Sequence, residues 1–249
     1  MGFFKKIKKS IIKRKEERQK RKRQIENLLG DYVVAEEKDE MLEKFVDLTE
    51  TYPEVEEKIQ KIAEAKAYVE KEAEYMFKVC IFGDGGVGKT TLLHRYYSNK
   101  FEDSMKMTIG ADIGVKIMNI DGKKIKLQIW DFGGQEQFRV FFQHFFKGAN
   151  AGIFMYSIIN KSSLVNIDDW LNILKTHASS DKDIQIPILM VGGKTDLEDK
   201  RVVTTEEAMK IQKSHNLHTF FECSSKTGEN VDVIFDALTR EIMKNQGYS

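Results

Sequence analysis

Short apolar runs alternate with longer amphipathic stretches through residues 77–249. The run at 186–191 is apolar almost throughout, which is typical of a strand covered on both faces of a sheet. The Asp121-Gly122 turn separates the second run from the third and indicates a hairpin. Strands that alternate with helices are typical of parallel α/β folds. We therefore predict an α/β domain with a mostly parallel six-stranded sheet flanked by helices and one antiparallel pair, with strands at 77–83, 115–120, 124–131, 151–158, 186–193 and 219–225.

The preceding residues, 1–76, are almost all charged or helix-forming, and Gly30 and Pro53 are their main interruptions. We divide this α-helical N-terminal extension into three helices, at about 3–28, 37–50 and 53–75. The third helix carries a narrow apolar stripe of the kind that docks on another helix or in a groove, formed by Val55, Ile59, Ile62, Val69, Ala73 and Met76 and interrupted by Lys66. A solvated helical spacer is the alternative interpretation.

Charge divides the same extension. The formal net charge at pH 7 is only +1, but residues 1–23 carry 12 Lys or Arg and 2 Glu, whereas residues 24–76 carry 6 Lys or Arg and 16 acidic residues. Residues 77–249 are nearly balanced. The predicted organisation is therefore a charged helical extension at 1–76, basic and amphipathic at 1–28 and acidic at 37–75, followed by an α/β domain at 77–249.

Several classes of protein are disfavoured. The two cysteines, Cys80 and Cys223, lie far apart, which argues against a disulfide framework or a zinc site and favours a reducing compartment. No run of 18 or more apolar residues is present, and the N-terminal residues lack the apolar centre of a secretory signal. We expect a cytoplasmic protein, peripheral at most on the cytoplasmic face of a membrane.

The segment GDGGVGKTT matches the phosphate-binding pattern G-x-x-x-x-G-K-[ST] at Gly83, Gly88, Lys89 and Thr90. It lies between a predicted strand and a predicted helix, where glycines let backbone N–H groups surround phosphate oxygens at a helix N-terminus. Lys89 is then expected to reach the β- and γ-phosphates, and the Thr90 hydroxyl to bind Mg²⁺. The pattern by itself is compatible with kinases, ATPases and GTPases.

Four further motifs follow in order, TIGADI from Thr108, WDFGGQEQFR from Trp130, FFKGANAGIFMYSI and ECSSKTGENV. Together with the phosphate loop, they resemble the Ras superfamily of small GTPases, most of all the Rab pattern, across essentially all of 77–249. The resemblance implies a P-loop NTPase G domain that binds GTP and GDP with Mg²⁺. It also implies a molecular switch that hydrolyses GTP slowly unless activated.

The resemblance implies the metal site and the catalytic residues. Thr90 and Thr108 would bind Mg²⁺ through their hydroxyls, and Asp131 would hold the ion through water. Gly134 would donate its N–H to the γ-phosphate, and Gln135 would orient the attacking water. Lys89, Gly134 and Gln135 are the expected catalytic residues, and Gly85 leaves room beside the phosphate for Gln135.

Guanine recognition by this family maps onto GKTD at 193–196 and SSK at 224–226. The Asp196 carboxylate can accept hydrogen bonds from the guanine N1–H and exocyclic amine. Facing adenine, it would stay unpaired at a cost of about 1–3 kcal/mol. Gly193 replaces the Asn that would bond N7 and tie this loop to the phosphate loop, so we expect GTP to remain the ligand with lowered affinity.

Lys194 and Phe101 are expected to cover the two faces of the base, with core packing as the alternative role of Phe101. Ser225 replaces the usual Ala, which matters little if its backbone N–H does the reading at O6. The expected nucleotide-binding residues are Gly83, Asp84, Gly85, Gly86, Val87, Gly88, Lys89, Thr90, Thr91, Phe101, Thr108, Gly134, Lys194, Asp196, Ser224, Ser225 and Lys226.

The ends of the chain differ from the Rab pattern. No cysteine for prenylation lies near the C-terminal KNQGYS, whereas Phe3, Phe4, Ile7 and Ile11 oppose several lysines on a helix and resemble the amphipathic anchor of Arf proteins. We expect residues 1–15 to contact an anionic membrane. Nucleic-acid contact, a targeting peptide and plain solvated charge are the competing interpretations of the basic segment, and we expect no nucleic-acid partner.

The expected protein partners are an exchange factor, a GTPase-activating protein that supplies a basic residue, and effectors at the switch regions. Residues 37–75 are expected to dock within the chain, on the basic segment or on the switch surface, or to form a homodimer. The predicted function is a GTP-hydrolysing switch at membranes in trafficking or signalling. The alternative is a GTP-bound interaction module or tether with negligible turnover.

Overall fold

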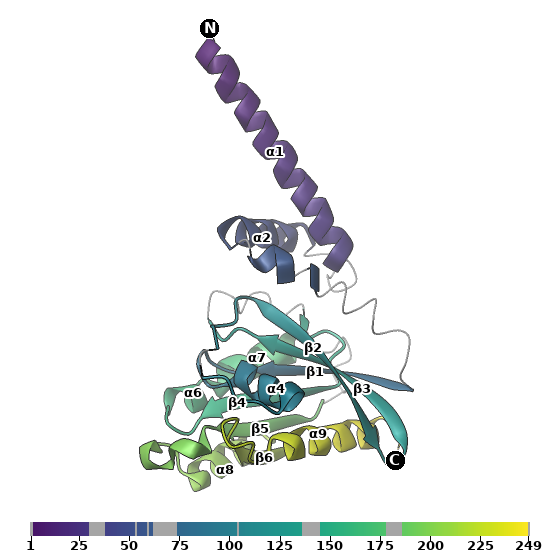
Figure 1. Ribbon diagram of the computed structural model, residues 1–249, viewed down its shortest axis with the longest axis vertical. Helices are drawn as coiled ribbons and strands as arrows, with labels where there is room; N and C mark the ends of the chain where they lie inside the picture. Colours follow the sequence, from purple (N-terminus) through teal and green to yellow (C-terminus); the bar gives the residue numbers. More distant parts are fainter. Residues whose placement is uncertain are drawn as a thin grey trace. The chain divides into compact units, whose positions relative to one another are not determined.

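The computed structural model describes residues 2–29, 38–52, 54–58, 60–61, 74–103, 105–135, 145–177 and 186–248. The chain forms two compact units, residues 1–69 and 70–249. In the first unit, helices α1, Gly2–Leu29, and α2, Lys38–Thr51, occupy the ranges predicted for the first two helices of the extension (Figure 1). Among the side chains described in this unit, the buried apolar ones are Ile25, Met41, Leu42, Phe45, Val46 and Val55.

Opposite charges join α1 to α2. The Arg18 guanidinium donates to Glu43, Asp47 and Glu50 at 2.9, 2.6 and 3.2 Å, and Lys22 Nζ lies 2.9 Å from a Glu43 oxygen. These bonds, from Lys22 first and then Arg18, lower the pKa of the Glu43 carboxyl below its usual value. Because the side chains are largely exposed, each pair contributes no more than about 1 kcal/mol. The acidic second helix is therefore docked on the basic helix of the same chain, as the charge pattern predicted.

The third predicted helix is confirmed only in part. Residues 54–58 and 60–61 are helical, while most of the apolar stripe predicted on 53–75 lies outside the described residues. Its predicted end is wrong, because Tyr75 and Met76 are the first residues of strand β1. They pair with Ile125 and Lys126 of the neighbouring strand, so that sheet hydrogen bonds override the helix-forming sequence.

The second unit contains one six-stranded sheet in the order β2-β3-β1-β4-β5-β6 (Figure 1). Strands β2 and β3 are antiparallel, joined by the predicted turn at Asp121-Gly122, and the other pairs are parallel. The predicted sheet is thereby confirmed. The strands are β1 Tyr75–Phe82, β2 Ala111–Ile120, β3 Lys123–Phe132, β4 Ala151–Ser157, β5 Ile188–Gly193 and β6 Thr219–Cys223.

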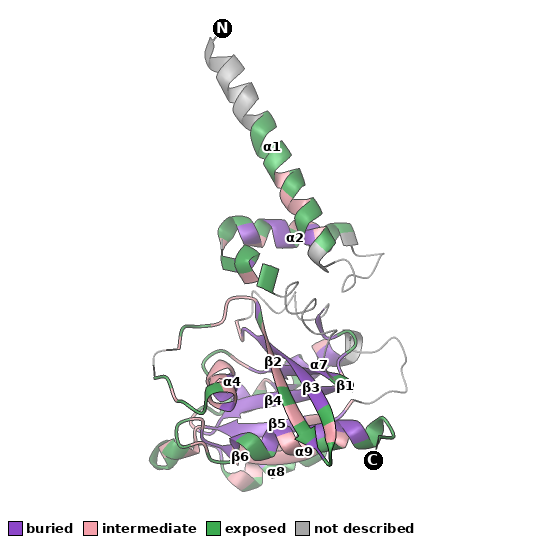
Figure 2. Cartoon of the chain, turned by 45° about the vertical axis from the view of Figure 1, so that its right-hand side comes forward, coloured by how far each residue is buried: buried purple, intermediate pink, exposed green. Residues whose placement is uncertain are grey.

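Strands β1, β3, β4 and β5 are mostly coloured as buried in Figure 2, whereas β2 and β6 are mostly intermediate or exposed. Tyr96, in the helix Lys89–Ser98, stacks on Phe235, in the helix Val231–Asn245, with ring centroids 3.8 Å apart. Both cysteines, Cys80 and Cys223, are free and buried. Among the described residues of this unit, the helical segments are α4 Lys89–Ser98, α6 Ser162–Val165, α7 Ile167–His177, the 3₁₀ helix η3 Thr195–Lys200, α8 Thr205–Ser214 and α9 Val231–Asn245.

The sheet topology places the motif residues together. The parallel strands β1, β3, β4, β5 and β6 point the same way, so their carboxyl ends meet at one edge of the sheet, where α/β proteins bind ligands. Gly83 follows β1, Asp131 lies at the end of β3, Gly193 ends β5 and Ser224 follows β6. None of the helices in the described part of the chain combines the length and the apolar character that crossing a bilayer requires.

Candidate functional site

A loop from Gly83 to Gly88 connects β1 to the N-terminus of α4. Gly83 has φ 135° and Gly88 has φ 109°, conformations that side chains with a Cβ rarely adopt. A Cβ at Gly83 would lie only 2.1 Å from the carbonyl oxygen of Met155. The glycines of the phosphate-binding pattern therefore permit a tight curl of backbone at a helix N-terminus, the geometry that binds phosphate.

Lys89 is the first residue of α4 and has only 5% of its surface exposed. Its Nζ donates to the carbonyl oxygens of Gly83 and Asp84, at 2.8 Å each. Burial is the largest influence on its pKa and lowers it to about 8, against the opposing effect of Asp131 and Asp84. An anion beside this ammonium group would restore the charge that burial disfavours.

Thr90, Thr108 and Asp131 meet although they lie far apart in the sequence. The Thr90 hydroxyl donates to Asp131 Oδ2 at 2.5 Å, and its oxygen lies 2.7 Å from that of Thr108. Thr108 also donates to Asp131 Oδ2, at 3.4 Å. Two hydroxyls and a carboxylate are oxygen donors, which Mg²⁺ prefers over nitrogen or sulfur. The donor set therefore fits the ion predicted from the sequence.

Gly134 lies directly against the phosphate-binding loop. A Cβ at this position would be 2.2 Å from both the Asp84 carbonyl carbon and the Gly85 nitrogen. At Gly85, by contrast, the nearest atom to an added Cβ would be 3.9 Å away, so this side of the loop is open. Gln135 lines the same pocket, and its Nε2 lies 3.9 Å from Met107 Sδ.

The side chains predicted to read the base come from the ends of β5 and β6. The Ser224 hydroxyl donates to Asp196 Oδ1 at 2.7 Å and in turn accepts from the backbone N–H of Lys226 at 3.2 Å. Lys194 Nζ donates to the Gly86 carbonyl at 2.6 Å and so connects the β5 loop to the phosphate-binding loop. Burial lowers the pKa of Lys194, and nearby Asp196 opposes that shift.

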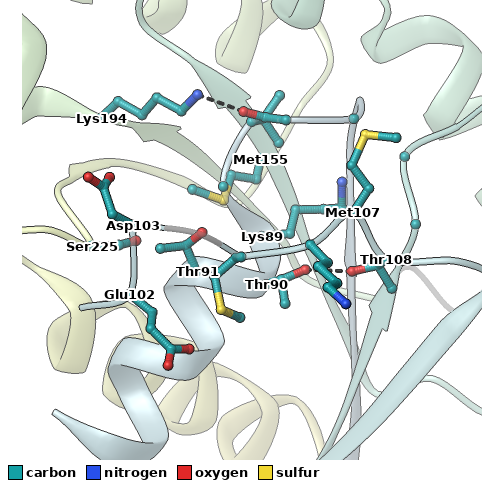
Figure 3. A pocket seen from close by; sticks show the side chains of 18 of the residues that line it. Lys89, Thr90, Thr91, Glu102, Asp103, Met107, Thr108, Met155, Lys194 and Ser225 are labelled. Carbon is teal, nitrogen blue, oxygen red and sulfur yellow. Dashed lines mark hydrogen bonds between the residues drawn. The ribbon is translucent and has the colours of Figure 1, made fainter. Parts of the chain in front are cut away.

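These elements enclose a pocket of about 380 Å³. Figure 3 shows Lys89, Thr90, Thr108, Lys194 and Ser225 around it. The predicted site residues that line the pocket are Gly85, Gly86, Val87, Gly88, Lys89, Thr90, Thr91, Phe101, Thr108, Gly134, Gln135, Lys194, Asp196, Ser225 and Lys226. The phosphate loop, the TIG and DFGGQ segments and the two predicted base-reading segments, GKTD and SSK, thus contribute to one cavity.

Four predicted residues lie behind this lining. Gly83 shapes the loop, Asp131 contacts the two threonines, and Ser224 supports Asp196. The Asp84 carboxylate accepts hydrogen bonds from Asn166 Nδ2 at 2.7 Å and Trp170 Nε1 at 3.0 Å. Its side chain therefore fixes the loop against the segment that begins α7, and only its backbone is on the phosphate side.

Several lining residues were not predicted from the sequence, among them Glu102, Asp103, Met105, Lys106, Met107, Phe132, Gly133, Met155 and Leu197. Most belong to irregular segments with no periodicity. Met155 lies within β4 and follows the apolar pattern of a core strand, so periodicity gave no signal that it reaches the pocket.

Comparison with known proteins decides the family. The Ras family model matches residues 78–244. The chain belongs to the Ras family. It is 38% identical over 183 residues to the Ras-related protein Rab-13 of Canis lupus familiaris, covering 74% of this chain and 85% of that protein. It is 40% identical over 173 residues to Rab-8B of Homo sapiens, covering 70% and 81% of the two chains.

Rab-11C of Dictyostelium discoideum is 42% identical over 173 residues, which cover 70% of this chain and 75% of that protein. The chain is therefore a Rab-like small GTPase, a hydrolase of the class that acts as switches in membrane trafficking. Ras-family GTPases bind GTP and GDP, generally with Mg²⁺. Helix α1 and helix α2 lie outside the part that the Ras family model matches.

Proposed function

We propose that this Rab-like chain is a guanine-nucleotide switch whose single nucleotide site is the pocket at the carboxyl edge of the sheet. One observation carries the proposal: the buried Lys89 ammonium, the Thr90 and Thr108 hydroxyls and the Asp196 carboxylate line one cavity, and Asp131 accepts hydrogen bonds from both threonines behind that lining. A nucleoside di- or triphosphate with Mg²⁺ offers the complementary anion, cation and base. The conformation of the loops around the pocket then depends on whether a γ-phosphate is bound.

On the phosphate side, Lys89 binds the β- and γ-phosphate oxygens, and the backbone of residues 84–91 encloses them. Thr90, Thr108 and Asp131 hold Mg²⁺, which neutralises phosphate charge when it is bound. Thr108 and Gly134 come from two loops that each contact the γ-phosphate. Loss of that phosphate releases both loops, which is how the nucleotide state is passed to a partner.

On the base side, Asp196 accepts hydrogen bonds from the guanine N1–H and exocyclic amine. The Ser224 hydroxyl donates to Asp196 Oδ1. This hydrogen bond fixes the orientation of the whole carboxylate group, including Oδ2. Lys194 and Phe101 cover the base faces, and Ser225 offers its backbone N–H to O6. An adenine in this position would offer the carboxylate no hydrogen-bond donor from the base, at a cost of about 1–3 kcal/mol.

Hydrolysis is proposed to depend on Gln135, which orients the attacking water. Among the described residues that line the pocket there is no arginine. A GTPase-activating protein is therefore expected to supply one, which accelerates turnover about 10³–10⁵-fold. Without it, hydrolysis is slow. The exchange factor and the effectors are proposed to bind the same two γ-phosphate loops.

Replacing Gln135 by leucine tests hydrolysis. Single-turnover phosphate release from preloaded GTP should slow at least about tenfold, because leucine cannot hold a water by hydrogen bonds. Met107→Leu is the matched control, since it removes the sulfur that contacts Gln135 and keeps the amide. Equal release by wild type and Gln135→Leu would reject this mechanism and favour the GTP-bound tether with negligible turnover.

We also propose that the chain is a cytoplasmic protein that reaches an anionic membrane through residues 1–15. In support, α1 begins at Gly2, and the described ion pairs with α2 use Arg18 and Lys22, which lie beyond that segment. Vesicles with anionic lipid should therefore sediment the protein at low salt and release it at high salt. Lys5→Glu with Lys6→Glu should abolish sedimentation; retention on neutral vesicles at high salt would contradict the proposal.

Docking of the acidic helix is proposed to regulate the switch. The contacts of α2 with α1 give this helix a partner within its own chain. Dimerisation through the stripe of residues 53–75 stays a prediction, since most of that stripe lies outside the described residues. Sedimentation velocity distinguishes a monomer from a dimer.

A further inference from the structure

Met155 of strand β4 forms part of one wall of the nucleotide pocket. Met155 is only 1% exposed, yet its side chain reaches the pocket and is drawn there in Figure 3. Its Cε lies 2.5 Å from the point where a Gly193 Cβ would be, and 3.5 Å from the corresponding point at Gly88. The methionine methyl group therefore occupies the space that a side chain at position 193 would need.

The side chains of Met155 and Val87 in this wall are apolar. Around the same point at Gly193 lie the carbonyl oxygens of Val87, at 3.3 Å, and Tyr156, at 3.5 Å. These oxygens are acceptors, and the side chains of Met155 and Val87 carry no N–H. The nearby Lys194 ammonium donates to the Gly86 carbonyl. In the described part of this wall, side chains thus offer a thioether and methyl groups and no amide donor.

The position of the wall relative to the base follows from Asp196. If Asp196 binds the N1–H and the 2-amino group of guanine, the five-membered ring with N7 lies on the other side of the base. The loop that carries Asp196 begins at Gly193, at the end of β5. In that orientation the N7 edge would face Gly193 and the Met155 methyl group beside it.

We propose that Met155 is a specificity-determining residue of the nucleotide site: its methyl group fills the space beside Gly193 and presents apolar surface to the N7 edge of guanine. The proposal rests on the proposed function. Two consequences follow. The site gains dispersion contacts with the base in place of a hydrogen bond to N7, and residues 155 and 193 compete for one volume.

The first consequence is tested without any substitution. In 7-deazaguanine, a C–H replaces N7, so a pocket that donates a hydrogen bond to N7 prefers guanine by about fivefold, the value of one neutral hydrogen bond. The affinities of the full-length wild type for GDP and 7-deaza-GDP should instead agree within about twofold. A preference for GDP of fivefold or more overturns the proposal.

The second consequence is tested by enlarging the side chain at position 193 and shortening the one at position 155. Gly193→Asn alone should bind GDP about twofold more weakly, because its Cβ would meet Met155 Cε at 2.5 Å and this methyl group, the end of a flexible side chain, must move aside. Met155→Ala with Gly193→Asn should recover affinity relative to Gly193→Asn and gain the fivefold preference for GDP over 7-deaza-GDP. If the double substitution binds GDP no better than Gly193→Asn, the two residues do not share a volume and the proposal fails.

Met190→Ala is the matched control. Met190 is fully buried in the neighbouring strand β5 and does not line the pocket. It should lower thermal stability, as Met155→Ala does, and leave nucleotide affinity unchanged at a temperature where the protein stays folded. Met155→Ala should weaken GDP and 7-deaza-GDP binding equally; if it weakens binding no more than Met190→Ala does, Met155 is only a core residue.

Failure of the proposal differs from failure of the proposed function. Binding of ADP as tightly as GDP, or binding of neither nucleotide, would remove the guanine site itself. Selective binding of GDP over both ADP and 7-deaza-GDP would keep the guanine site and remove only the role of Met155.

Discussion

Lys89→Ala is expected to lower the affinity for GDP and GTP by at least about a hundredfold. The ammonium group is buried at the start of α4, where it can make charge-assisted hydrogen bonds to phosphate, each worth about 1.5–3 kcal/mol. Two such bonds correspond to a hundredfold or more. Titration with a fluorescent guanine nucleotide measures the change directly.

Lys116→Ala is the control for that loss. Lys116 Nζ also donates to a backbone carbonyl, that of Tyr96 at 3.1 Å, but Lys116 does not line the pocket. It should lose little or no nucleotide affinity. Because Lys89 also donates to Gly83 and Asp84, thermal unfolding must show that the Lys89→Ala protein is folded. A folded Lys89→Ala protein that binds GDP within threefold of wild type would refute the phosphate site.

The sheet was predictable because its central strands are buried on both faces and the turn residues between them are specific. Boundaries were harder to predict. Strand β2 begins at Ala111, four residues before the predicted start, although glycines such as Gly110 and Gly114 are unfavourable in strands. Pairing of Ala111 with Phe132 extends the ladder, which is a property of the partner strand and not of the local sequence.

The phosphate and metal residues were predictable for a different reason. Their motifs are short, and the sheet topology brings them to one edge. Gly83 and Asp131 lie at the carboxyl ends of parallel strands, and Thr108 precedes the antiparallel strand β2, which starts at the same edge. The sequence could not show which residues of a motif line the pocket and which ones contact other parts of the fold. Asp84 and Trp170 are 86 residues apart, and their contact is a tertiary one that turns the carboxylate away from the pocket. The same is true of Met155, whose strand pattern is that of any core residue.

The N-terminal unit shows the limit of reading charge alone. Segregated basic and acidic stretches predicted that the two would meet, and Arg18 does contact three carboxylates of α2. Exposed pairs of this kind add little stability, so buried side chains such as Phe45 and Ile25 contribute most of the packing. Charge therefore selects which helices pair, and apolar burial holds them.

Asp196→Asn is expected to reverse the preference of the site between guanine and xanthine nucleotides. Guanine presents two donors, N1–H and the 2-amino group, whereas xanthine presents N1–H and a 2-oxo acceptor. The Ser224 hydroxyl donates to Asp196 Oδ1, so an amide at this position keeps its oxygen there and directs its NH₂ group at the base. That group repels the guanine amine and donates to the xanthine oxygen. GDP affinity should fall about a hundredfold and xanthosine diphosphate should become the tighter ligand.

Asp199→Asn provides the matched control, because Asp199 lies in the same helix η3, is exposed and does not line the pocket. It removes the same charge and should leave the ratio of GDP to xanthosine diphosphate affinity unchanged. A general loss of affinity for both nucleotides in Asp196→Asn would mean that the carboxylate only supports the loop through Ser224. The reversal, by contrast, requires direct contact between this side chain and the base, since no rearrangement of the loop alone makes a donor favourable opposite one purine and unfavourable opposite the other.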